Sequence, residues 1–149
     1  MLQHAFVAFV LAGVSYAAYL DLRTSEVPDW VSLTVAAGSL LYYGYQSAVA
    51  GTAAPLLASL ISGTVLFALG WTMYLAGMWG GADAFVLGAV GYALPSLPAG
   101  YGGAAAPWPF PFSLLMTVFT VGAVYSVVYA AVVAARADGF RQKLGSELQ

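Results

Sequence analysis

Long apolar runs alternate with short polar segments along this chain, and the runs predict helices. Apolar stretches cover about residues 3–20, 31–49, 56–79 and 112–135, with a shorter one at 83–94. A helix needs about 20 apolar residues to cross a bilayer, and the short run, at about 12 residues, would cover only about 18 Å. We therefore predict an all-α fold, a polytopic transmembrane helix bundle of about five to six spans.

The composition favours a bilayer as the solvent of this chain. Hydrophobic residues make up 62% of it and charged residues 7%, whereas a soluble domain carries about 25% charged residues. Residues 30–82 and 84–135 carry no formal charge. Residues 95–111 are rich in proline and glycine and predict a loop or a broken interfacial segment. No internal repeat is evident, so we expect residues 1–149 to form a single transmembrane domain.

Charge placement predicts the orientation of the spans. Arg23 follows the first run, and the other three basic residues lie in the C-terminal tail, at 136–143. Five crossings put all four on one side, as the positive-inside rule requires. We therefore expect a multi-pass cell-membrane protein with its N-terminus outside. The same topology places Asp21, where the first run ends, and Asp83, where the fourth begins, at the cytoplasmic face.

The scarcity of cysteine and histidine limits the kinds of catalytic or metal site that this chain can form. The chain has no cysteine and one histidine, His4, which excludes a disulfide framework, a thiol nucleophile and a His-rich metal centre. A net charge of −2 and the lack of a basic patch argue against a nucleic-acid partner. We expect no metal and no cofactor, and carboxylates remain as the candidate chemistry.

Asp21 and Asp83 are the candidate catalytic residues. An ionisable side chain in or beside a membrane is costly and suggests function, although each aspartate could simply mark or cap a helix end. Gly80 and Gly81, just before Asp83, can adopt positive φ and let a peptide come close. Two neighbouring carboxylates share a proton, so one can act as base on a water while the other polarises a carbonyl.

Two segments together resemble a known family. YLDLRTSEVPDW, which contains Asp21, and MWGGADAF, which contains Asp83, look like the two catalytic motifs of type IV prepilin peptidases and archaeal preflagellin peptidases, which are GxGD-type aspartyl membrane proteases. In that family the first aspartate is followed by an Ile/Val-Pro-Asn/Asp element, here residues 27–29. The second aspartate ends a glycine-rich motif, here residues 80–83. The likeness is detailed over about residues 15–90.

The resemblance implies an aspartyl endopeptidase that cuts the leader from prepilin-like or preflagellin precursors at the cytoplasmic face, in contact with the lipid bilayer. Asp21 and Asp83 would be catalytic. Gly80 and Gly81 would contact the substrate, and Glu26 and Asp29 could attract the basic residues of the leader.

Three departures from the family pattern affect this expectation. Phe85 stands where the family often has a basic residue, which could alter the charge of the active site. The chain lacks the Cys-rich N-methyltransferase portion of many bacterial members, so we expect peptidase activity without methylation, a pattern typical of archaea. Familiar archaeal members are similar to six-span proteins, whereas we count five spans.

Two other readings stay open. The chain could be a small carrier or channel in which the aspartates line a proton or cation path. It could also be a structural subunit of a membrane machine, with the aspartates as helix caps. The sequence does not reveal which precursor is cut, nor whether the chain forms a homo-oligomer.

Overall fold

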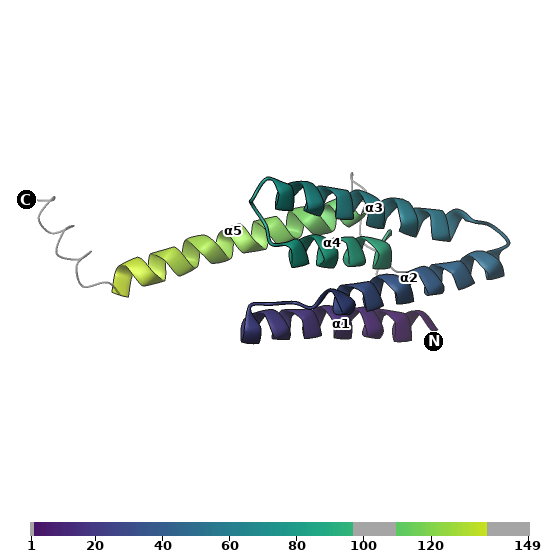
Figure 1. Cartoon of the computed structure of the whole chain (residues 1–149), viewed down its shortest axis with the longest axis horizontal. Helices are drawn as coiled ribbons and strands as arrows, with labels where there is room; N and C mark the ends of the chain where they lie inside the picture. The colour runs from purple at the N-terminus through teal and green to yellow at the C-terminus, as the bar shows by residue number, and fades with distance from the viewer. Residues whose placement is uncertain (1, 97–109, 137–149) are drawn as a thin grey trace, which may run out of the picture. The chain divides into compact units, whose positions relative to one another are not determined.

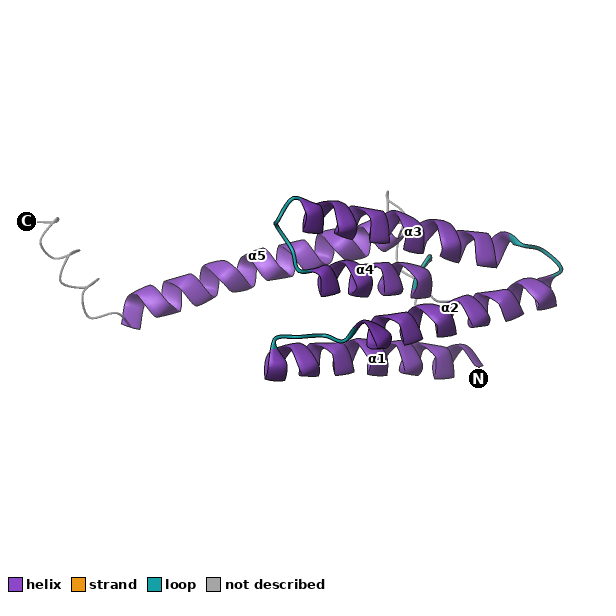
Figure 2. Cartoon of the chain, viewed as in Figure 1, coloured by secondary structure: helices purple, strands orange, loops and turns teal. Residues whose placement is uncertain are grey.

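The computed structural model describes residues 2–96 and 110–136, and every regular element in this part is a helix (Figure 2). The helices are α1 (Leu2–Thr24), α2 (Asp29–Ala50), α3 (Ala54–Leu75), α4 (Gly81–Ala93) and α5 (Phe110–Arg136). They correspond one to one with the five apolar runs. The prediction of an all-α helical bundle is confirmed.

The chain divides into two compact units, at 1–111 and 112–149. The first holds α1 to α4, which we call the α1–α4 bundle, and the second consists of most of α5 and the C-terminal tail. Within the bundle, the short helix α4 contacts α1, α2 and α3, and its contact with α3 is the most extensive. Figure 1 shows that α1 ends and α4 begins at the same end of this bundle. The expectation of a single domain stays a prediction.

Two helix boundaries differ from those that hydropathy predicted. α1 continues past Asp21 to Thr24, where the Thr24 hydroxyl donates to the Leu20 carbonyl at 2.9 Å and Ser25 adopts a φ of 54°. α3 ends at Leu75, before the apolar run does, because Gly77 takes a φ of 70° that an α-helix does not allow. Hydropathy does not report such local backbone turns.

Small residues let α3 and α4 approach closely. A methyl group on Gly70 would lie 2.8 Å from the Ala84 Cα atom, and one on Gly91 would lie 2.9 Å from the Gly63 Cα atom. Both separations are too short for real carbon atoms, so these positions require glycine. Close backbone approach of this kind is the usual basis of helix association in membranes.

The C-terminal end of α4 lies inside the bundle, and side chains from two other helices donate hydrogen bonds to its last carbonyls. The Ser59 hydroxyl of α3 donates to the Tyr92 carbonyl at 2.6 Å, and the Tyr43 hydroxyl of α2 donates to the Ala93 carbonyl at 3.1 Å. A helix end leaves its last carbonyls unpaired, which is costly away from water. These bonds therefore stabilise a helix only 13 residues long within the bundle.

Three of the helices, α1, α3 and α5, are long and apolar enough to cross a membrane. α2 has 22 residues but is less apolar, and α4 has 13. The prediction that all five helices cross, with the N-terminus outside, stays a prediction. The proline-rich segment at 97–109 and the tail at 137–149, with two of the basic residues used to predict orientation, lie outside the described residues.

Candidate functional site

Asp83 lies in the first turn of α4, at its third residue. Its Oδ2 atom accepts a hydrogen bond from the Gly80 amide at 3.0 Å, and its own amide donates to the Gly80 carbonyl at 3.2 Å. This reciprocal pair caps the helix, so the capping role is present. The side chain is nevertheless exposed, and a carboxylate has further lone pairs that can accept other hydrogen bonds. The Asp83 carboxylate can therefore cap α4 and still accept a hydrogen bond from another group.

Asp21 lies in the last turn of α1, and its side chain is exposed. Its backbone carbonyl accepts a hydrogen bond from the Ser25 amide at 2.8 Å, and the positive φ of Ser25 ends the helix there. The carboxylate itself takes no part in this C-terminal cap. Because a carboxylate at a helix C-terminus is disfavoured by the dipole, stability of the helix does not account for an aspartate at this position.

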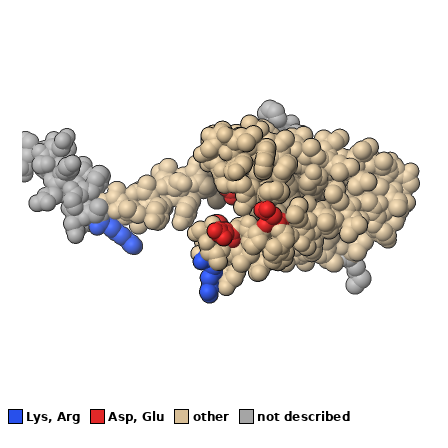
Figure 3. All heavy atoms as spheres, viewed as in Figure 1, with Lys and Arg blue, Asp and Glu red and all other residues tan. Residues whose placement is uncertain are grey.

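The structure brings the two aspartates to one end of the α1–α4 bundle, since α1 ends where α4 begins and the two helices are in contact (Figure 1). Figure 3 shows acidic side chains gathered at that end, with a basic side chain beside them. Within the described residues no hydrogen bond joins the Asp21 and Asp83 carboxyls, and no group of three or more potential metal ligands is found.

Glu26 and Asp29 lie at the same end, between α1 and the first turn of α2, and both are exposed. The Glu26 amide donates a hydrogen bond to the Thr24 hydroxyl at 3.3 Å, and the Glu26 carbonyl oxygen lies 2.9 Å from the same hydroxyl oxygen. Asp29 is the first residue of α2, where the helix dipole favours a negative charge. Neither carboxylate forms an ion pair in the described part of the chain, so both are free to attract a cation.

The backbone at Gly80 and Gly81 differs from what we expected. Gly80 has a φ of −73°, and the positive φ values of glycine in the described residues are at Gly51 and Gly77. A methyl group on Gly80 would lie 3.4 Å from Asp83 Oδ2, and one on Gly81 would lie 3.6 Å from the Tyr74 ring. Both are ordinary contacts. Neither glycine uses positive φ here, and the fold does not itself require glycine at either position, so their contact with a substrate stays a prediction.

Phe85 packs against α3. Its ring centroid lies 5.5 Å from that of Phe67 and 6.2 Å from that of Trp71, and Trp71 in turn lies 5.1 Å from Tyr74. We call these four residues the α3–α4 aromatic cluster. The residue that replaces the family's usual basic side chain thus serves packing. The signal for Tyr74 in the sequence is its spacing of three residues from Trp71, which places both rings on one helix face.

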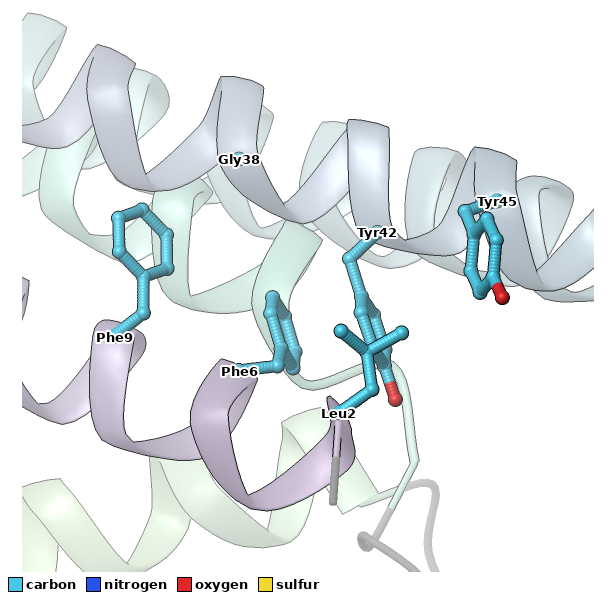
Figure 4. Close-up of a pocket in the computed structure, with 6 residues that line it drawn as sticks. All are labelled: Leu2, Phe6, Phe9, Gly38, Tyr42 and Tyr45. Carbon is cyan, nitrogen blue, oxygen red and sulfur yellow. The ribbon is translucent and has the colours of Figure 1, made fainter.

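A cavity of about 500 Å³ lies between α1 and α2 (Figure 4), and neither Asp21 nor Asp83 lines it. Figure 4 shows the aromatic rings of Phe6, Phe9 and Tyr42 lining it, and the Phe6 and Tyr42 rings stack at 3.9 Å. From Phe9 to Asp21 the helix rises about 18 Å. No carboxylate lines this cavity, and Asp21 lies toward the other end of α1.

Residues 8–131 match the model of the type IV leader peptidase family. The matched region contains both aspartates and all five helices apart from their outermost residues. The chain belongs to this family. Family membership confirms the resemblance on which the assignment of the two motifs rests.

Two relatives are archaeal preflagellin peptidases. The one from Methanococcus voltae is 30% identical over 89 residues, which is 60% of this chain and 38% of that protein. The one from Methanocaldococcus jannaschii is 30% identical over 76 residues, which is 51% of this chain and 32% of that protein. The matched region thus spans about a third of the length of either relative. No solved structure matches the chain significantly.

Proposed function

We propose that this protein is an aspartyl endopeptidase that cleaves the leader peptide of preflagellin-like or prepilin-like precursors at the cytoplasmic face of the membrane. One observation carries the proposal: a chain of the type IV leader peptidase family has Asp21 in the last turn of α1 and Asp83 in the first turn of α4, at the same end of one bundle. The names of the two archaeal relatives support preflagellin-like precursors as substrates.

The proposed mechanism needs only the two carboxyls and a water molecule. In this mechanism one carboxyl carries a proton and the other is ionised. The ionised carboxylate takes a proton from water, which attacks the scissile carbonyl carbon, while the protonated one donates to the carbonyl oxygen. Proton transfer to the amide nitrogen then releases the leader.

Glu26 and Asp29 supply the proposed contact with the leader. Both are exposed, Glu26 in the short connection after α1 and Asp29 at the first residue of α2, and neither is paired within the described residues. Two uncompensated carboxylates give this end of the bundle a negative potential that attracts Lys and Arg side chains. The placement of both catalytic aspartates in terminal helix turns also favours a peptidase over a carrier, whose path would need ionisable groups along the membrane's depth.

Cleavage of synthetic precursors by the purified protein in detergent tests the proposal. Each precursor joins a leader to an apolar segment of about 20 residues, and mass spectrometry locates the cut. We expect a single cut that removes the whole leader, with basic leaders removed faster than matched leaders in which Gln replaces Lys and Arg. Intact precursors after incubation with the folded protein would contradict the proposal.

A further inference from the structure

Tyr74 brings a phenol to the turn that holds Asp83. It lies in the last full turn of α3, and a methyl group on Gly81 would lie 3.6 Å from its Cε2 atom and 3.8 Å from Cζ. The hydroxyl is bonded to Cζ. The polar end of this side chain therefore lies beside the first residue of α4, two residues before Asp83.

Packing and the backbone turn fix the Tyr74 ring in this position. Its ring contacts Trp71 with centroids 5.1 Å apart, and its carbonyl accepts a hydrogen bond from the Gly77 amide at 2.9 Å. Gly77, with its φ of 70°, then turns the chain toward α4 (Figure 1). The ring is thus placed by α3 and by the α3–α4 connection together, and the placement does not depend on a hydrogen bond from the hydroxyl.

The hydroxyl of Tyr74 is available, in contrast to two other tyrosines of the bundle. Tyr43 donates to the Ala93 carbonyl, and the Tyr92 hydroxyl bonds to Thr64. For Tyr74 no hydroxyl bond is found among residues 2–96 and 110–136, and the side chain is 41% exposed. An aromatic residue at a membrane boundary can serve as an interfacial anchor, but that role does not explain contact with Gly81.

Gly80 and Gly81 form a strip of bare backbone between two polar groups. A methyl group on Gly80 would lie 3.4 Å from Asp83 Oδ2, and a methyl group on Gly81 would lie against the Tyr74 ring. Since the fold does not require glycine at these positions, their lack of side chains leaves room for an incoming peptide. A peptide laid along the strip would lie near both the Asp83 carboxylate and the Tyr74 ring.

We propose that the Tyr74 hydroxyl donates a hydrogen bond to a backbone carbonyl oxygen of the bound precursor, next to the scissile peptide bond. A phenol O–H group is a hydrogen-bond donor, and a peptide carbonyl oxygen is an acceptor. This inference rests on the proposed peptidase function, which it extends by one substrate-binding residue. The donor holds the peptide over Gly80 and Gly81 while the aspartates act on the neighbouring carbonyl.

Tyr74→Phe tests the inference, because it removes the hydroxyl and keeps the ring on Gly81. We expect kcat/KM for precursor cleavage to fall about tenfold, the typical loss for one hydrogen bond, with an unchanged unfolding temperature. In an Asp83→Asn background, which prevents turnover, the same change should weaken precursor binding by a similar factor. Tyr45→Phe, an exposed tyrosine in α2 away from the aspartates, is the matched control and should change neither quantity.

The outcomes separate this inference from the proposed function. Full activity of Tyr74→Phe, while the wild-type protein cleaves precursors, overturns the role of the hydroxyl and leaves the peptidase assignment intact. Reduced turnover with unchanged precursor binding likewise overturns a binding role. An equal loss in Tyr45→Phe would assign the effect to the bundle as a whole. If the wild-type protein does not cleave any precursor, the proposed function itself fails.

Discussion

The Asp83 Oδ2 atom accepts a 3.0 Å hydrogen bond from the Gly80 amide. One side chain thus caps α4 and, in the proposed mechanism, acts on the substrate. Asparagine retains an oxygen that can accept this bond, whereas alanine does not. We therefore expect Asp83→Asn to unfold at the wild-type temperature and Asp83→Ala to unfold at a lower one, while both lose cleavage. Thermal unfolding in detergent, measured beside precursor cleavage, checks both effects.

Replacing each of the three glycines around the α3–α4 connection by alanine should have different effects on stability and on cleavage. Gly80 and Gly81 have room and no positive φ, so each change should leave stability unchanged or raise it by about 0.4–1 kcal/mol through the unfolded state. The added methyl groups should nevertheless slow cleavage by obstructing the peptide. Gly77→Ala forces alanine to a φ of 70° and should cost about 1–2 kcal/mol. Wild-type cleavage by Gly80→Ala and Gly81→Ala would argue against peptide contact there.

Ser59 should contribute more to the stability of the protein than a serine that bonds only within its own helix. Its hydroxyl pairs the Tyr92 carbonyl at the end of α4, so Ser59→Ala leaves a buried acceptor unpaired and should destabilise the protein by about 1–3 kcal/mol. Ser126→Ala is the control, since Ser126 bonds to the Gly122 carbonyl of its own helix and should change stability by at most about 0.5 kcal/mol. Chemical denaturation of the two variants compares these values, and equal stabilities would contradict the anchoring of α4.

Glu26 and Asp29 should control the preference for basic leaders. Each exposed charge pair contributes up to about 1 kcal/mol, so Glu26→Lys with Asp29→Lys should lower kcat/KM for a Lys-rich leader by about tenfold. A Gln-substituted leader should be cleaved at the wild-type rate, and salt should weaken the discrimination. The competition of both precursors in one reaction measures the preference directly. Unchanged preference in the double variant would remove these residues from leader recognition.

The absence of cysteine allows the distance between the aspartates to be tested with introduced pairs. Asp21→Cys with Asp83→Cys places thiols in the last turn of α1 and the first turn of α4, and a short bismaleimide linker should join them. Asp21→Cys with Ala93→Cys is the control, because positions 83 and 93 of α4 are about 15 Å apart along the helix. Equal cross-linking of both pairs would contradict the placement of the aspartates at one end.

Hydropathy predicted the helices because each apolar run reflects burial in lipid or in the bundle, and the two motifs predicted where Asp21 and Asp83 lie. The extension of α1 to Thr24 depends on the Ser25 φ of 54°, which residue types do not specify. The close pairs Gly70–Ala84 and Gly63–Gly91 depend on which helices become neighbours. The contact of Tyr74 with Gly81 also arises only after the chain has turned at Gly77.

The rate of precursor cleavage by the folded Asp21→Asn and Asp83→Asn variants tests the central claim most directly. If the two carboxyls act as one catalytic pair, each variant should lose activity by about a thousandfold or more, and the double variant should be no slower than either single one. Wild-type cleavage by either variant would contradict the account.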